Sequence, residues 1–111
     1  MNSNLELNYA DFEKYYVVHG PNLGGVQYIF RFDNDYGASV LKLPDFWGRN
    51  GGFKLWELAV IIFDDGENYD LDYTTPITDE VIQDLTDKEV CELLGRIKDL
   101  PKKQLLIDSL H

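Results

Sequence analysis

The stretch Leu55-Trp56-Glu57-Leu58-Ala59-Val60-Ile61-Ile62-Phe63 is the longest nearly uninterrupted apolar run in the chain. Its β-branched and aromatic residues are typical of a strand covered on both faces, and such a strand belongs in the middle of a sheet. The run is shorter than the roughly 20 apolar residues that cross a bilayer. It ends at Asp64-Asp65-Gly66, which favours a turn. We therefore expect the fold to be organised around this strand.

A hairpin is predicted before the central strand. Residues 26–33 alternate, with Ile29 as the exception, and they place four apolar side chains on one face: Val26, Tyr28, Phe30 and Phe32. Asn34-Asp35 favours a short turn, because both residues tolerate positive φ. The chain then runs back over 36–43, where Gly37 indicates a bulge or a close backbone approach.

Two further strands complete the expected sheet. A β-rich segment over 13–19 stops at the glycine-rich loop 20–25. After the central strand, a second hairpin returns through residues that alternate between apolar and acidic: Tyr69, Asp70, Leu71, Asp72 and Tyr73. This pattern predicts an outer strand with one apolar face and one acidic face.

Helices are expected in the last third of the chain. Thr78 favours a cap for a short helix that ends at Leu85. Thr86 and Glu89 have the spacing of a capping box, and an apolar stripe follows at helical spacing: Val90, Leu93, Leu94 and Ile97. Pro101 is suited to open a last helix. Strands first and helices afterwards predict an α+β fold, with an antiparallel sheet of about five strands packed on one face by C-terminal helices.

The length of 111 residues, of which 44% are apolar, matches one domain with one core, spanning residues 1–111. The net charge of −10 is uneven, because residues 64–92 hold eleven acidic side chains and one basic side chain. This surface repels nucleic acid and anionic membranes and attracts a basic protein. The acidic residues that we expect to be displayed are Asp64, Asp65, Glu67, Asp70, Asp72, Asp79 and Glu80.

The sequence predicts a cytoplasmic protein. Its first residues have neither the basic region nor the apolar core of a secretory signal, and its one cysteine, Cys91, permits no internal disulfide.

No motif specifies catalysis, a metal or a cofactor, and we expect none of the three. Neighbouring carboxylates disfavour a thiolate at Cys91. His111 ends the chain, and His19 beside a turn is more often an incidental polar residue than an acid or base. Asp33-Asn34-Asp35-Tyr36-Gly37 fails the calcium-loop pattern, because its glycine comes one place early and no acidic residue closes the loop.

Glu57 lies in the middle of the predicted central strand, where a buried carboxylate requires a partner or a proton. Arg31 or Arg49 could pair with it. A functional alternative is a pocket beneath the loop 44–53, in which Glu57 acts with Arg31, Tyr36 or His19.

The loop over 45–52 is a second candidate for binding. Its aromatic residues and arginine, Phe46, Trp47 and Arg49, are residue types that dominate interaction hot spots, and flanking glycines give it freedom to adapt. Trp47 folded back over the sheet is the competing interpretation.

Three segments, Phe32-Asp33-Asn34-Asp35-Tyr36-Gly37-Ala38-Ser39-Val40, Leu55-Trp56-Glu57-Leu58-Ala59-Val60 and Tyr73-Thr74-Thr75-Pro76-Ile77-Thr78-Asp79-Glu80-Val81-Ile82, resemble a group of small uncharacterised proteins of bacteriophages and prophages of Gram-positive bacteria. The resemblance covers roughly residues 30–97. It implies an intracellular protein of a mobile element, and it brings no catalytic residue with it.

These observations favour a non-catalytic interaction protein whose acidic surface meets a basic protein partner, in one version as a mimic of nucleic acid. A small enzyme or ligand-binding domain that uses Glu57 is the first alternative. A homodimer formed through a sheet edge or through Phe46 and Trp47 is the second.

Overall fold

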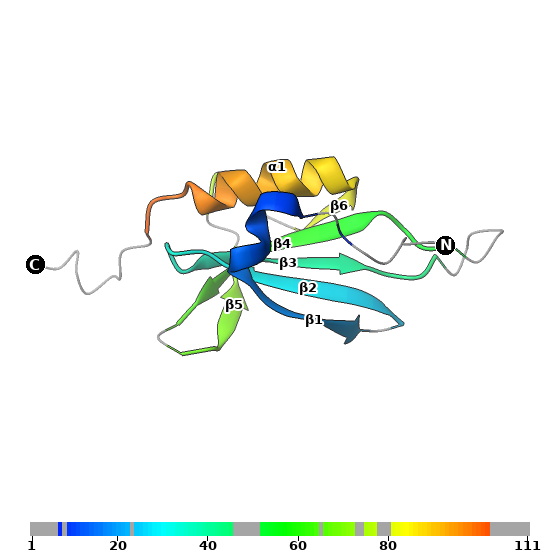
Figure 1. Ribbon diagram of the computed structural model, residues 1–111, viewed down its shortest axis with the longest axis horizontal. Helices are drawn as coiled ribbons and strands as arrows, with labels where there is room; N and C mark the ends of the chain where they lie inside the picture. The colour runs from blue at the N-terminus through cyan, green and yellow to red at the C-terminus, as the bar shows by residue number, and fades with distance from the viewer. Residues whose placement is uncertain are drawn as a thin grey trace, which may run out of the picture.

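The computed structural model describes the backbone of residues 7, 9–22, 24–45, 52–64, 66–72, 75–77 and 81–102. These residues form an antiparallel sheet together with one short and one longer helix (Figure 1). The strands are β1 (Tyr16–Asn22), β2 (Gly25–Arg31), β3 (Tyr36–Lys42), β4 (Trp56–Phe63), β5 (Tyr69–Leu71) and β6 (Ile82–Leu85). The helices are the 3₁₀-helix η1 (Ala10–Tyr15) and the α-helix α1 (Asp87–Lys98). The predicted α+β fold is confirmed.

Strand β4 has neighbours on both sides, as expected for the central strand. The sheet order is β1-β2-β3-β4-β5, and β6 also pairs with β4. β5 pairs with the Phe63 end of β4 and β6 with the Trp56 end, so the two short strands share one side of β4. The side chains of Trp56, Leu58 and Val60 are fully buried. Burial of each stabilises the fold by roughly 1.5–3 kcal/mol.

The main core lies between the sheet and the two described helices, which cover the same face of the sheet (Figure 1). The predicted alternation in residues 26–33 is confirmed, since the four apolar side chains expected on one face all belong to this core: Val26, Tyr28, Phe30 and Phe32. Ile29, the predicted exception, joins Ile61 and Phe63 in a smaller buried cluster on the opposite face.

The first turn of helix α1 is capped by residues of its own sequence, whereas its C-terminal end is contacted by a turn that is distant in the sequence. The capping box is confirmed, because Thr86 Oγ1 accepts from the N–H of Glu89 and Glu89 Oε1 accepts from the N–H of Thr86. Beside this end, Trp56 Nε1 donates to Asp87 Oδ1 at 2.7 Å, which ties α1 to the central strand. Val90, Leu94 and Ile97 of the predicted stripe are buried; Leu93 is partly buried.

The predicted turn at Asn34-Asp35 is confirmed, and Asp35 has a φ of 69°. Asn34 is buried, and its side chain also reaches the C-terminal end of α1, where Nδ2 donates to the carbonyl oxygens of Ile97 and Leu100. Gly37 follows with the close backbone approach that we expected, because a Cβ at this position would lie 2.0 Å from the carbonyl oxygen of Phe30.

Two predicted elements differ from the structure, and a third falls mostly outside the described residues. The strand predicted over 13–19 begins only at Tyr16, because residues 13–15 belong to η1. β1 continues through Pro21, which an edge strand tolerates because its outer N–H groups need no ladder partner. The helix predicted over 78–85 is wrong, since Ile82–Leu85 forms β6 against the free side of β4. The helix predicted from Pro101 lies outside the described residues beyond Lys102, and neither Pro101 nor Lys102 is helical.

No helix in the described ranges is long and apolar enough to cross a membrane.

Candidate functional site

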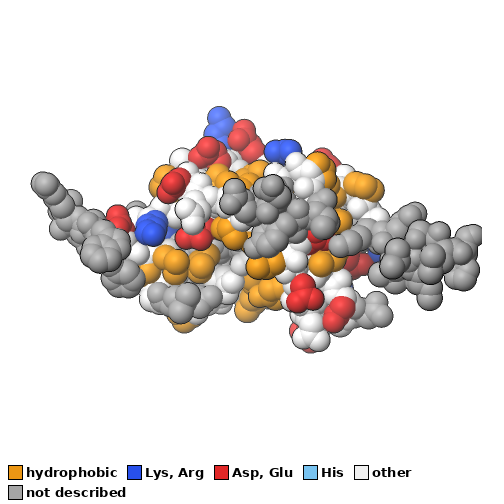
Figure 2. Space-filling model, turned by 180° about the vertical axis from the view of Figure 1, so that it is seen from behind, with side chains coloured by type: hydrophobic (Ala, Val, Ile, Leu, Met, Phe, Trp, Pro, Cys, Tyr) orange, Lys and Arg blue, Asp and Glu red, His pale blue; other side chains and the backbone are white. Residues whose placement is uncertain are grey.

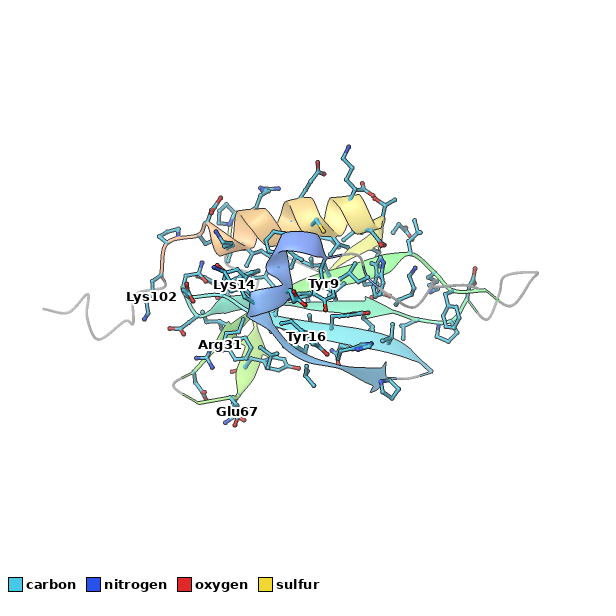
Figure 3. All side chains as sticks on the ribbon, in the orientation of Figure 1. Tyr9, Lys14, Tyr16, Arg31, Glu67 and Lys102 are labelled. Atoms are coloured by element: carbon cyan, nitrogen blue, oxygen red, sulfur yellow. The ribbon has the colours of Figure 1, made fainter. Side chains whose placement is uncertain are left out.

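The predicted acidic surface is only partly displayed. Asp64, Glu67 and Asp70 are exposed in the β4–β5 turn and in β5, and Figure 3 shows Glu67 at the tip of this turn, pointing away from the sheet. Asp65, Asp79 and Glu80 lie outside the described residues. The expected exposure of Asp72 is wrong, because this side chain is buried, at 4% of its full exposure.

The burial of Asp72 follows from the register of β5. Leu71 pairs with Ile61 and so lies on the sheet face opposite α1, where it is 53% exposed. Side chains alternate along a strand, so Asp72 turns to the other face, while its N–H donates to the carbonyl oxygen of Val60. The apolar and acidic faces of this segment are therefore reversed relative to the prediction.

Much of the exposed negative charge is uncompensated. Asp35 forms ion pairs with Arg31 at 3.2 Å and with Lys102 at 3.4 Å. Burial raises the pKa of Asp35, but hydrogen bonds and charges from these two cations outweigh it and leave that pKa below its usual value. Other exposed carboxylates have no ion-pair partner among the described residues: Asp64, Glu67, Asp70, Asp84 and Glu92.

The distribution of charge is visible on the face opposite to the view of Figure 1. Figure 2 shows acidic side chains scattered around the apolar ones on this face, with few basic side chains among those that are described. Negative charges that no cation neutralises produce a field beyond the surface, and this field attracts positively charged molecules. The surface is suited to electrostatic steering of a basic partner.

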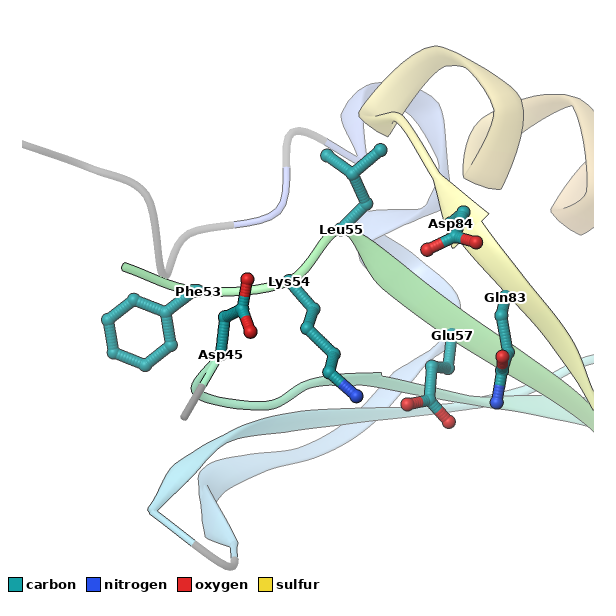
Figure 4. A pocket seen from close by; sticks show the side chains of 7 residues that line it. All are labelled: Asp45, Phe53, Lys54, Leu55, Glu57, Gln83 and Asp84. Carbon is teal, nitrogen blue, oxygen red and sulfur yellow. The ribbon is translucent and has the colours of Figure 1, made fainter. Parts of the chain in front are cut away.

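Glu57 lines a hollow, as one of our alternatives expected, but with different neighbours. The hollow has a volume of about 530 Å³ and lies at the Trp56 end of β4 (Figure 4). Lys54 extends its amino group toward Glu57. The other lining residues come from the chain around the Pro44–Phe53 bridge and from β6: Asp45, Phe53, Leu55, Gln83 and Asp84.

Arg31 and Tyr36 lie away from Glu57, and Arg49, the other predicted ion-pair partner, lies outside the described residues. Arg31 pairs with Gly37 at the other end of the sheet, and its guanidinium donates to the carbonyl oxygens of Asp64 and Gly66. Tyr36 is buried in the main core, on the face opposite to Glu57. A pocket formed by Glu57 with Arg31 and Tyr36 is therefore not present, and the pairing of Arg31 with Glu57 is wrong.

The remaining candidates that lie within the described residues bring no catalytic group to the hollow. His19 stacks on the ring of Tyr28, with ring centroids 4.3 Å apart. Cys91 is partly buried on α1, and the aromatic loop residues Phe46, Trp47 and Arg49 lie outside the described residues, as does His111. No group of three potential metal ligands occurs in the described part of the chain. The hollow offers carboxylates, an amine and an amide, which suit binding of a polar group.

Sequence reasoning identified Glu57 but missed Lys54, Gln83 and Asp84. Lys54 directly precedes the central apolar run, and its position next to the loop 44–53 was the available signal. Gln83 and Asp84 gave no signal, because they were assigned to a helix.

Comparison of the chain with protein-family models, curated proteins and solved structures finds no match.

Proposed function

We propose that this protein is a non-catalytic interaction module of the cytoplasm that binds a basic protein partner through its acidic surface. The observation that carries the proposal is the group of exposed carboxylates that have no ion-pair partner in the described ranges, which includes Asp64, Glu67 and Asp70. Such groups gain attraction from an approaching cationic surface without first breaking an internal ion pair.

The interior supports a binding role over a catalytic one. The helix-sheet interface is filled by one continuous apolar cluster, and no buried side-chain polar atom of the described residues lacks a hydrogen-bond partner. Active sites commonly keep buried polar groups without hydrogen-bond partners. Here the polar groups with unused capacity lie at the surface.

The test neutralises the acidic surface and compares it with a matched control. The variant carries Asp64→Asn, Glu67→Gln and Asp70→Asn; Asn retains the oxygen that accepts from the N–H of Gly66. The control removes the same charge from exposed carboxylates elsewhere, with Glu13→Gln, Asp33→Asn and Asp99→Asn. Each chain is immobilised and used in a pull-down from a lysate of Gram-positive bacteria at low and high salt, and the captured partner is then titrated.

We expect the surface variant to bind about tenfold more weakly than the control, since three exposed ion pairs contribute on the order of 1.4 kcal/mol together. Binding of the wild-type chain should weaken with salt. A partner whose affinity is the same for both variants contradicts the proposal. If the surface imitates nucleic acid, duplex DNA should also displace that partner.

The hollow at Glu57 favours a second candidate function, the binding of a small polar ligand. Its carboxylates and the amine of Lys54 could hold a molecule that carries both charges. The measurement is a thermal-shift screen of such molecules with wild-type protein and with Glu57→Gln. A ligand that raises the melting temperature of both chains equally contradicts a role for Glu57.

A further inference from the structure

A second concavity lies beside α1, on the sheet face that carries the main core. Its volume is about 620 Å³, and it is lined by Ile77, Ile82, Leu85, Glu89, Glu92, Leu93 and Arg96. Leu85 is buried beneath it, while Ile77, Ile82 and Leu93 are half-buried and pack against the main core. The groove therefore continues the apolar core to the surface between α1 and β6.

The groove has an apolar floor and a charged rim. Glu89, Glu92 and Arg96 are exposed on α1 and follow one another at intervals of three and four residues, so they line one side of the groove. From Glu89 to Arg96 the helix rises about 10 Å, which matches two turns of a second helix lying alongside. Two carboxylates against one guanidinium leave this rim net negative.

A helix suits the groove better than an added strand. Strand addition would need a regular ladder along the free edge of β6, but Asp84 in the middle of β6 has a φ of 61°. The register of β6 on β4 also shifts between Trp56 and Leu58. Such irregularities bend a strand and turn its edge away from a regular partner.

We propose that this groove binds an amphipathic helix of the protein partner, with apolar side chains on the floor and Lys or Arg next to Glu89 and Glu92. The inference rests on the proposed function, because it gives the basic partner a binding element. The charge of the rim complements a basic helix. A second copy of this chain fits poorly, since each copy carries a net charge of −10.

The experiment uses two synthetic peptides of identical composition. One places Leu at i, i+3, i+4 and i+7 with Lys between them, and the other is scrambled so that it has no apolar face. Affinities are measured by calorimetry at low salt for the wild-type chain, for Glu92→Lys and for the control Glu67→Lys, which makes the same charge change in the β4–β5 turn. Amide chemical shifts of the wild-type chain locate the bound peptide.

We expect the amphipathic peptide to bind at least tenfold more tightly than the scrambled one. Glu92→Lys should weaken this binding about tenfold, and Glu67→Lys should weaken it less. Shift changes should cluster at residues 89–96 and 82–85. Circular dichroism checks that both variants fold. If Glu92→Lys does not fold, Glu92→Gln is used in its place.

The failures of the two proposals are distinguishable. If both peptides bind equally, and if Glu92→Lys and Glu67→Lys have equal effects, the proposal that the groove binds a helix is wrong. The proposed function of the acidic surface is not affected by that result. Absence of peptide binding, both to the full chain and to a chain that lacks 103–111, overturns the proposal of a helix-binding groove, and the pull-down then decides the acidic-surface function separately. The segment 103–111 contains Leu105, Leu106 and Leu110 and could compete for the groove. Peptide binding that appears only after deletion of 103–111 assigns the groove to this segment and overturns the partner helix.

Discussion

Replacing Asn34 with Ala should be among the most destabilising polar substitutions in this chain. The amide of Asn34 joins two parts of the fold that are more than sixty residues apart in the sequence. Its Nδ2 donates to the carbonyl oxygens of Ile97 at 2.9 Å, Lys98 at 3.3 Å and Leu100 at 2.8 Å, and its Oδ1 accepts from the N–H of Tyr36 at 3.0 Å. The last carbonyls of a helix have no partner within the helix, so this side chain supplies one.

The expected loss of stability in Asn34→Ala follows from the hydrogen bonds that the substitution removes. The two N–H groups of the amide make about two full bonds to the three carbonyl oxygens, and the oxygen makes a third. A hydrogen bond contributes roughly 0.5–1.5 kcal/mol net, and a buried group left without its partner costs more. We therefore expect Asn34→Ala to lower the free energy of unfolding by about 2–4 kcal/mol. In a chain of this length, the melting temperature should fall on the order of 10 °C.

Urea unfolding followed by circular dichroism measures the effect, with the exposed neighbour Asp33→Ala as the control. Asn34→Asp adds a sharper test. It keeps the oxygen that serves Tyr36, but it places a negative charge at the negative end of the dipole of α1. Asn34→Asp should be less stable than Asn34→Ala at neutral pH and should regain stability at acid pH, where the new carboxyl is neutral. A loss below about 0.5 kcal/mol for Asn34→Ala would refute the reasoning.

Three further outcomes are expected. Thr86→Ala should cost about 1 kcal/mol by removal of the helix cap. Hydrogen bonds from the backbone N–H and the hydroxyl of Thr86 lower the pKa of Glu89, so their stabilisation is present above the unfolded pKa of Glu89 and is lost as pH falls through its folded pKa. Because Thr86→Ala removes the hydroxyl but keeps the N–H, the acid limb of its urea unfolding against pH should be only slightly flatter than that of the wild type. Gly37→Ala should destabilise by roughly 1–3 kcal/mol or more, since its Cβ would meet Phe30 O at 2.0 Å, while Gly20→Ala, with nothing within 4 Å, should stay close to wild type in thermal unfolding. If the β1 edge joins two chains, Val18→Lys, at a position that is 51% exposed, should halve the mass seen by light scattering; a monomeric wild-type chain rejects that alternative.

Local sequence patterns were sufficient for the elements whose neighbours do not change their conformation. The central strand has a continuous apolar run, the turn at Asn34-Asp35 has residues that tolerate positive φ, and the cap of α1 depends on Thr86 and Glu89 alone. The residues that make up each of these patterns lie within a few positions of one another in the sequence. Their sequence signal is therefore complete.

The segment 82–85 shows where local patterns fail. Thr78, Asp79 and Glu80 have the composition of a helix start, but the side of β4 near Trp56 would lack a strand partner without β6. Pairing with β4 satisfies backbone groups there and buries Leu85 against the main core. This tertiary gain outweighs a helix propensity that amounts to tenths of a kcal/mol per residue.

The same segment explains why the candidate site was only partly predictable. Glu57 was identifiable as the one ionisable residue of an apolar run, but the residues opposite it depend on which strand pairs with β4. Strand β6 sends Gln83 into the hollow of Glu57, while Ile82 and Leu85 line the groove beside α1. Both concavities therefore include residues of one short strand, which pairs beside the central strand and has a positive φ at Asp84. A sequence interpretation that assigns 82–85 to a helix loses both surfaces at once, and with them the basis for distinguishing an electrostatic surface from a shaped binding site.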